Sequence, residues 1–187
     1  MSCADALGLD FGTSNSAVGV MVDGMPRLVQ VESGAQTLPT SVFFDFEARQ
    51  TVFGSQANAA LIAGEDGRFM RALKSVLGTS LMHEPRRMMG ETLTLVDVVS
   101  RFLAHLKAAA EAEFGRPFTR VVSGRPVRLH SADAQRNEQA LTDLRACYAR
   151  AGFDEVRFLF EPEAAAIAAA QKGVGQGWKL IVDIGGG

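Results

Sequence analysis

Short apolar runs separated by polar turn residues open the chain. Residues 6–9 and 16–22 are apolar enough to form buried strands, and Asp23-Gly24 between the second run and the next is a strong two-residue turn signal. A third apolar run covers residues 26–31. The N-terminal segment therefore predicts an antiparallel meander of three strands.

The middle of the chain predicts further strands followed by helices. Strands are expected at residues 42–46 and 50–54, and the alanine-rich residues 57–63 favour a helix. A second helix, ending at Gly78, is predicted because apolar residues recur there at helical spacing: Phe69, Leu73, Val76 and Leu77.

A long amphipathic helix is predicted to follow Thr94. Thr94 and Asp97 have the spacing of a capping box, and an apolar stripe continues to Leu106 before Gly115. Residues 79–90, which precede this helix, are basic and rich in methionine, a composition typical of an exposed loop or an edge strand.

The C-terminal part predicts strands alternating with helices. Strands are expected at residues 120–123 and 156–160, and helices at residues 131–151 and 162–172. This alternation favours a parallel crossover, so the predicted fold class is α/β. Residues 179–183 predict one more buried strand.

Composition is that of a globular protein with one sizeable core, since 47% of the 187 residues are hydrophobic and 21% are charged. The net charge of −2 gives no electrostatic case for nucleic acid or an anionic membrane as a partner. No apolar run approaches the roughly 18 residues of a membrane span. Cys3 and Cys147 are unclustered, which predicts neither a disulfide framework nor a zinc site. We therefore expect a cytoplasmic protein.

The first candidate for chemistry is the turn between the first two strands, within residues 8–16. Successive N–H groups in such a turn, together with the hydroxyls of Thr13, Ser14 and Ser16, can hold phosphate oxygens. Asp10 lies beside the turn, where the first strand is expected to end. A carboxylate next to a polyphosphate needs a cation between them, which predicts Mg²⁺. The alternative is an ordinary hairpin whose polar side chains make turn hydrogen bonds.

The same device recurs at the end of the chain, where the strand at residues 179–183 ends in Asp183 and leads into a run of glycines. Two such strands in one sheet would place two carboxylates on opposite sides of one metal–phosphate group. Together, residues 8–16 and 183–187 resemble the two phosphate motifs of the actin, sugar-kinase and heat shock protein 70 ATPase superfamily. They are most similar to heat shock protein 70.

The resemblance implies a ribonuclease H-like, actin-type ATPase lobe with a mixed five-stranded sheet and flanking helices. Residues 1–38 and 116–187 would form this core, and residues 39–115 a smaller inserted α/β subdomain. ATP or ADP with Mg²⁺ would lie between the two glycine turns, with Asp10 and Asp183 positioning metal-bound water. The implied phosphate-binding residues are Gly12, Thr13, Ser14, Asn15, Gly185, Gly186 and Gly187.

Two more residues acquire a role through the resemblance. By their spacing alone, Lys74 is a solvated lysine and Glu161 a carboxylate at a helix start. In the family, a Lys before an apolar pair and Gly reaches the γ-phosphate, and a Glu-Pro before an alanine-rich helix orients water and metal. Lys74 and Glu161 match these motifs, so the implied catalytic residues of the ATPase are Lys74, Glu161, Asp10 and Asp183.

The chain also departs from the usual family pattern. Gly124-Arg125-Pro126 is more similar to the YegD-type branch, which lacks the peptide-binding half of the chaperones. The sequence stops at Gly187, inside the second phosphate loop, before the second lobe that holds the adenosine in the family. We therefore expect a first lobe that is inactive, or nearly so, by itself. Client peptides and co-chaperones are the further partners that the resemblance implies.

Other classes share the two phosphate loops. A sugar or acid kinase, a bacterial actin-like filament protein and a member that binds nucleotide without turnover are the alternatives. Lys74 and the Glu-Pro-alanine helix favour a heat shock protein 70-like ATPase over the first two. Other nucleotide folds are disfavoured, because no Gly-x4-Gly-Lys-Ser/Thr motif is present and Gly173, Gly175 and Gly177 lack dinucleotide spacing.

Overall fold

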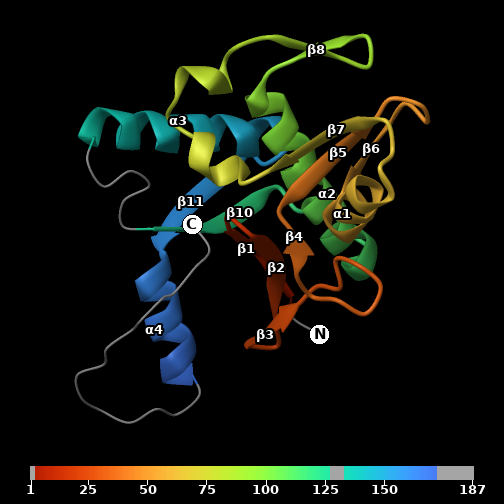
Figure 1. Cartoon of the computed structure of the whole chain (residues 1–187). Helices are drawn as coiled ribbons and strands as arrows, with labels where there is room; N and C mark the ends of the chain where they lie inside the picture. Colours follow the sequence, from red (N-terminus) through yellow and green to blue (C-terminus); the bar gives the residue numbers. More distant parts are fainter. Residues whose placement is uncertain (1–2, 127–132, 172–187) are drawn as a thin grey trace.

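A computed structural model describes residues 3–126 and 133–171 of the chain. These residues form two larger units of structure (Figure 1). One is a main sheet that packs against helices, and the other is a smaller sheet beside it. The strand predicted at residues 179–183 lies outside the described residues.

The main sheet is mixed, as predicted. Its strand order is β11-β10-β1-β2-β3, with the short β4 paired to β2 off this five-stranded path. The pairs β1–β2 and β2–β3 are antiparallel, which confirms the meander, and β1–β10 and β10–β11 are parallel, which confirms the crossover. The strands are β1 (Cys3–Phe11), β2 (Asn15–Val22), β3 (Met25–Leu28), β4 (Leu38–Pro39), β10 (Arg120–Arg125) and β11 (Glu155–Phe160).

Two strand ends differ from the prediction. β1 continues through Asp10 to Phe11, so Asp10 is paired with Ala17 of β2 rather than placed after the strand. β3 ends at Leu28, although Val31 beyond it is still buried. Burial of an apolar side chain in the core therefore does not require that residue to be part of the sheet.

The smaller sheet has the strand order β6-β5-β7. β5 (Ser41–Asp45) is buried along its length, and it lies between β6 (Gln50–Phe53) and β7 (Gly67–Arg71). α1 (Gly54–Ala63) contacts β5, β6 and β7.

The prediction of a helix that ends at Gly78 is wrong for the part that contains Phe69. Phe69 belongs to β7 and is paired with Phe43 of β5. Ala72, at a left-handed φ of 53°, then separates the strand from a short 3-10 helix, η1 (Leu73–Val76). Pairing with a fully buried central strand outweighs the helical spacing of the apolar residues here.

Residues 79–90 combine a buried and an exposed part. They include a 3-10 helix, η2 (Ser80–Met82), and β8 (Arg86–Met88), which forms a hairpin with β9 (Glu91–Leu93). Met82 and Met88 are buried in the core, whereas the expectation of an exposed loop or edge strand holds for most of their neighbours.

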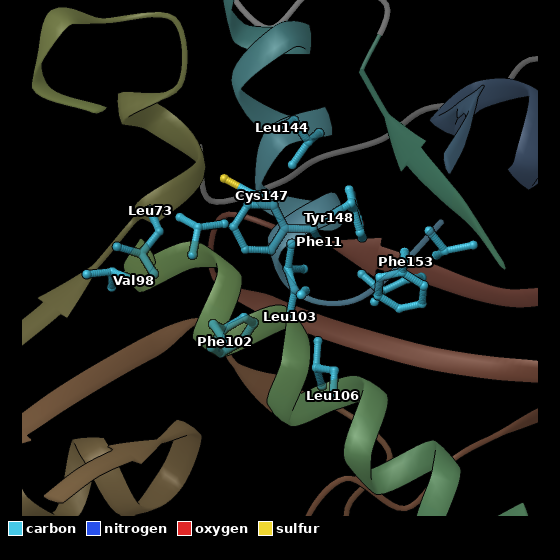
Figure 2. Packing of buried hydrophobic residues seen from close by; sticks show 14 of the residues in the cluster. Phe11, Leu73, Val98, Phe102, Leu103, Leu106, Leu144, Cys147, Tyr148 and Phe153 are labelled. Carbon is cyan, nitrogen blue, oxygen red and sulfur yellow. The ribbon is translucent and has the colours of Figure 1, made fainter. Parts of the chain in front are cut away.

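Helices α2 and α3 build the core over the main sheet. α2 (Leu95–Phe114) begins with the predicted capping box of Thr94 and Asp97, and ends at Gly115 with a φ of 64°. Figure 2 shows how side chains of α2 and α3 (Ala134–Arg150) meet around Phe11 of β1. The labelled members of this core are Phe11, Leu73, Val98, Phe102, Leu103, Leu106, Leu144, Cys147, Tyr148 and Phe153.

The predicted helix at residues 131–151 is shorter within the described part of the chain. α3 starts at Ala134, and the Asp133 side chain accepts a hydrogen bond from the Arg136 amide as its N-cap. Cys147 on this helix is fully buried, and burial raises the pKa of its thiol to about 12, which fits a structural thiol.

The last described helix, α4 (Glu161–Gln171), begins one residue earlier than predicted, so Glu161 is its first residue and follows β11 directly. α4 runs away from the end of the main sheet (Figure 1). None of the helices in residues 3–126 and 133–171 is long and apolar enough to cross a bilayer.

Candidate functional site

The turn between β1 and β2 is built around a close backbone approach. A Cβ atom on Gly12 would lie 2.1 Å from the carbonyl oxygen of Asn15, so a side chain cannot fit there. Thr13 is half-buried, and Ser14 and Asn15 are exposed. The turn therefore presents the three predicted phosphate-binding residues after Gly12 at the surface.

The segment that enters the smaller sheet holds this turn in place. The Thr40 amide donates to the Ser14 carbonyl at 2.8 Å, and Asn15 pairs with Pro39 of β4. Ser16 is buried, and its Oγ lies 2.8 Å from Oγ1 of Thr40. The Ser16 hydroxyl thus ties the turn to Thr40, and its expected contact with a phosphate stays a prediction.

Asp10 and Glu161 converge beside Gly124. A Cβ atom on Gly124 would lie 3.8 Å from Oδ1 of Asp10 and 3.5 Å from Cγ of Glu161. The parallel strands β1, β10 and β11 explain this convergence, since each brings one of the three residues to the same end of the sheet. The carboxyl ends of neighbouring parallel strands are the usual place for ligands in α/β folds.

Lys74 joins this group from a distant part of the sequence. Its Nζ lies 2.8 Å from Oε1 of Glu161, and the Lys74 and Glu161 side chains are 10% and 26% exposed. The ammonium thus balances one of the two carboxylates at the end of the sheet. Three of the four predicted catalytic residues are brought together: Lys74, Glu161 and Asp10.

A buried hydroxyl pair, which the sequence did not point to, lies close to Asp10. The Tyr148 hydroxyl donates to Oγ of Ser123 at 2.7 Å, one residue before Gly124. Burial, and to a smaller extent the charge of Asp10, raise the pKa of Tyr148, so its phenol stays protonated. The available signal was the single tyrosine of the sequence on the apolar face of α3, since a buried phenol needs a partner.

The second predicted glycine turn cannot be placed beside the first. Asp183, Gly185, Gly186 and Gly187 lie outside the described residues. The described residues contain no cluster of three or more metal-ligating side chains. Mg²⁺ does not require such a cluster, because it keeps several waters and is bound by one or two carboxylates with phosphate oxygens. Asp10 beside the Gly12 turn fits that donor set.

Two comparisons with known proteins find sequences similar to this chain. The model of the Hsp70 protein family matches residues 6–87 and 85–187, which include all the predicted site residues. The chain is 28% identical over 183 residues to the chaperone protein DnaK of Metamycoplasma hominis. The aligned region covers 97% of this chain and 28% of that relative, so the chain spans less than a third of the relative's length.

Proposed function

The chain belongs to the Hsp70 family, and from this premise we propose that it forms the first lobe of an ATP-binding and ATP-hydrolysing Hsp70-like chaperone or chaperone-related protein. The observation that carries the proposal is the meeting of Lys74, Glu161 and Asp10 at one end of the main sheet. A carboxylate pair with one fixed ammonium suits a site that binds a metal-complexed polyphosphate.

The phosphates would lie against the turn formed by Gly12, Thr13, Ser14 and Asn15. Its tight backbone and exposed side chains offer N–H and hydroxyl donors to an anion. Asp10 would hold Mg²⁺ through bound water, with Asp183 proposed as the second carboxylate. When bound, the metal neutralises phosphate charge.

Lys74 and Glu161 would act on the terminal phosphoryl group and the attacking water. The Lys74 ammonium, held at 2.8 Å from Glu161, is a fixed positive charge that can stabilise negative charge developing during transfer. The Glu161 carboxylate can accept a hydrogen bond from the attacking water and orient it. Catalysis of this kind rests on positioning and charge stabilisation, without a covalent intermediate.

Finer assignments are also proposals. The assignment to the YegD-type branch rests on Gly124-Arg125-Pro126. The division into a core of residues 1–38 and 116–187 and an inserted subdomain of residues 39–115 is kept as a prediction. We also propose a second lobe that completes the nucleotide site, client peptides or co-chaperones as partners, and a cytoplasmic location.

The test is ATP hydrolysis by the intact gene product that carries this chain. Asp10→Asn keeps the size of the side chain and removes its charge, so we expect hydrolysis to fall about 10- to 100-fold, as for other residues that support a metal. Asp66→Asn, which changes an exposed carboxylate next to β7, is the matched control and should retain the parental rate. Equal rates for the parent and Asp10→Asn would contradict the proposal.

A further inference from the structure

We propose that Asp143 is a positioning residue for Lys74, whose buried carboxylate fastens the segment that carries Lys74 onto α3. The catalytic role of Lys74 rests on the proposed function, whereas the position of Lys74 comes from the structure alone. The proposal assigns a role in the site to a helix that contributes none of the predicted site residues.

The Asp143 carboxylate is buried and receives several hydrogen bonds. Its side chain is 1% exposed. Oδ2 accepts from the Gly78 amide at 2.8 Å, and Oδ1 accepts from Nε2 of Gln139 at 2.7 Å and lies 2.9 Å from Nε2 of His83. A charge withdrawn from water in this way is tolerated only because donors surround it.

Two of these donors lie at the two ends of one loop. Gly78 follows the 3-10 helix that carries Lys74, and His83 follows η2. Asp143 therefore closes residues 78–83 against α3 from both sides. The approach is tight, since Gly78 has a φ of 74° and a Cβ atom there would lie 2.3 Å from the carbonyl oxygen of Arg136.

The short helix that carries Lys74 needs such an anchor. η1 spans four residues, and its N-cap residue, Ala72, has no side chain that could accept a hydrogen bond from the helix amides. A 3-10 helix of this length has little stability of its own. Leu73 and Leu77 on either side of Lys74 are buried in the core that Figure 2 shows around α2 and α3.

These contacts fix the backbone on both sides of Lys74, and the Lys74 side chain extends from this fixed segment. Its backbone is held by Leu73 before it and by Leu77 and the Gly78–Asp143 hydrogen bond after it. Nζ then reaches Glu161 at 2.8 Å. Loss of the Asp143 charge should loosen the segment and expose the Lys74 ammonium without removing any group that touches the nucleotide.

The test measures the position of Lys74 without using activity. Nucleotide-free intact gene product is pulse-labelled with acetic anhydride, and acetylation of individual lysines is followed by mass spectrometry. Lys107 is the internal reference, because it is 15% exposed and also bonded, to Glu111 and to the Gly152 carbonyl. In Asp143→Asn we expect Lys74 to be acetylated about tenfold faster, because hydrogen bonds to a charged group are lost. The acetylation rate of Lys107 should stay unchanged.

Two further variants make the result decisive. Glu138→Gln removes a charge from the exposed side of the same helix and should leave Lys74 labelling unchanged. His83→Ala removes one of the donors at a half-exposed position and should raise Lys74 labelling less than Asp143→Asn does. If Asp143→Asn does not fold, His83→Ala decides, and unchanged Lys74 labelling in it overturns the proposal.

Other outcomes separate positioning from general stability and from failure of the proposed function. Unchanged Lys74 labelling in folded Asp143→Asn overturns the proposal, and so does an equal rise at Lys74 and Lys107. If Lys74→Ala hydrolyses ATP like the parent, the proposed role of Lys74 fails, while the labelling still decides the anchor. If both proposals hold, Asp143→Asn lowers kcat when it is introduced into the parent protein. Introduced into Lys74→Ala, it lowers kcat no further.

Discussion

Glu161 and Asp143 are carboxylates that both support Lys74, yet their surroundings are opposite. Glu161 is 26% exposed, and among the described residues Lys74 is the side chain that its carboxylate binds. Asp143 is 1% exposed and meets three donors, two from the loop at residues 78–83 and one from its own helix. A carboxylate has about four acceptor positions, so Glu161 keeps capacity for water or a ligand, whereas most of the capacity of Asp143 is used within the fold.

The free energy of unfolding should separate these two carboxylates. Asp143→Ala removes a buried carboxylate that accepts three hydrogen bonds, and we expect a loss of about 3 kcal/mol. Glu161→Ala breaks one partly exposed ion pair and should cost about 1 kcal/mol or less. Urea unfolding of the intact gene product, followed by a signal from this lobe, measures both. Equal losses would contradict the comparison.

Gly78 allows a sharper test of how closely the Lys74 segment approaches α3. Gly78→Ala adds a Cβ that would lie 2.3 Å from the carbonyl oxygen of Arg136, so we expect a loss of about 2 kcal/mol or more. Gly115 is the matched control, since its φ of 64° is similar but no atom lies within 4 Å of an added Cβ. Gly115→Ala should cost about 1 kcal/mol, the left-handed penalty alone. Thermal unfolding that gives the same loss for both would refute a close approach at Gly78.

Local patterns predicted most elements of the fold. The meander around Asp23-Gly24 and the capping box at Thr94 are each set by residues near one another in the sequence. The parallel crossover follows from the alternation of strands and helices, although it pairs distant residues such as Arg120 and Glu155. The prediction was wrong around Phe69, because pairing of β7 with β5 is a tertiary effect that helical spacing does not contain.

The candidate site was predicted only in part. The resemblance named Lys74 and Glu161, but their contact joins residues 87 positions apart, which no local pattern encodes. The hydrogen bond between Ser16 and Thr40 could not be predicted either, because Thr40 lies in another segment. Asp143 was missed for the same reason, since a carboxylate on the buried side of α3 is explained only by donors such as Gly78, which the fold brings to it.

The central claim is that Lys74 acts on the phosphates held at the end of the main sheet. The most direct measurement is single-turnover ATP hydrolysis by Lys74→Ala in the intact gene product, with ATP affinity measured in parallel and Lys107→Ala as the control. We predict that hydrolysis falls about 100-fold or more in Lys74→Ala, while ATP affinity changes only a few-fold and Lys107→Ala hydrolyses ATP normally. Parental hydrolysis in Lys74→Ala, or the same loss in both variants, would contradict the account.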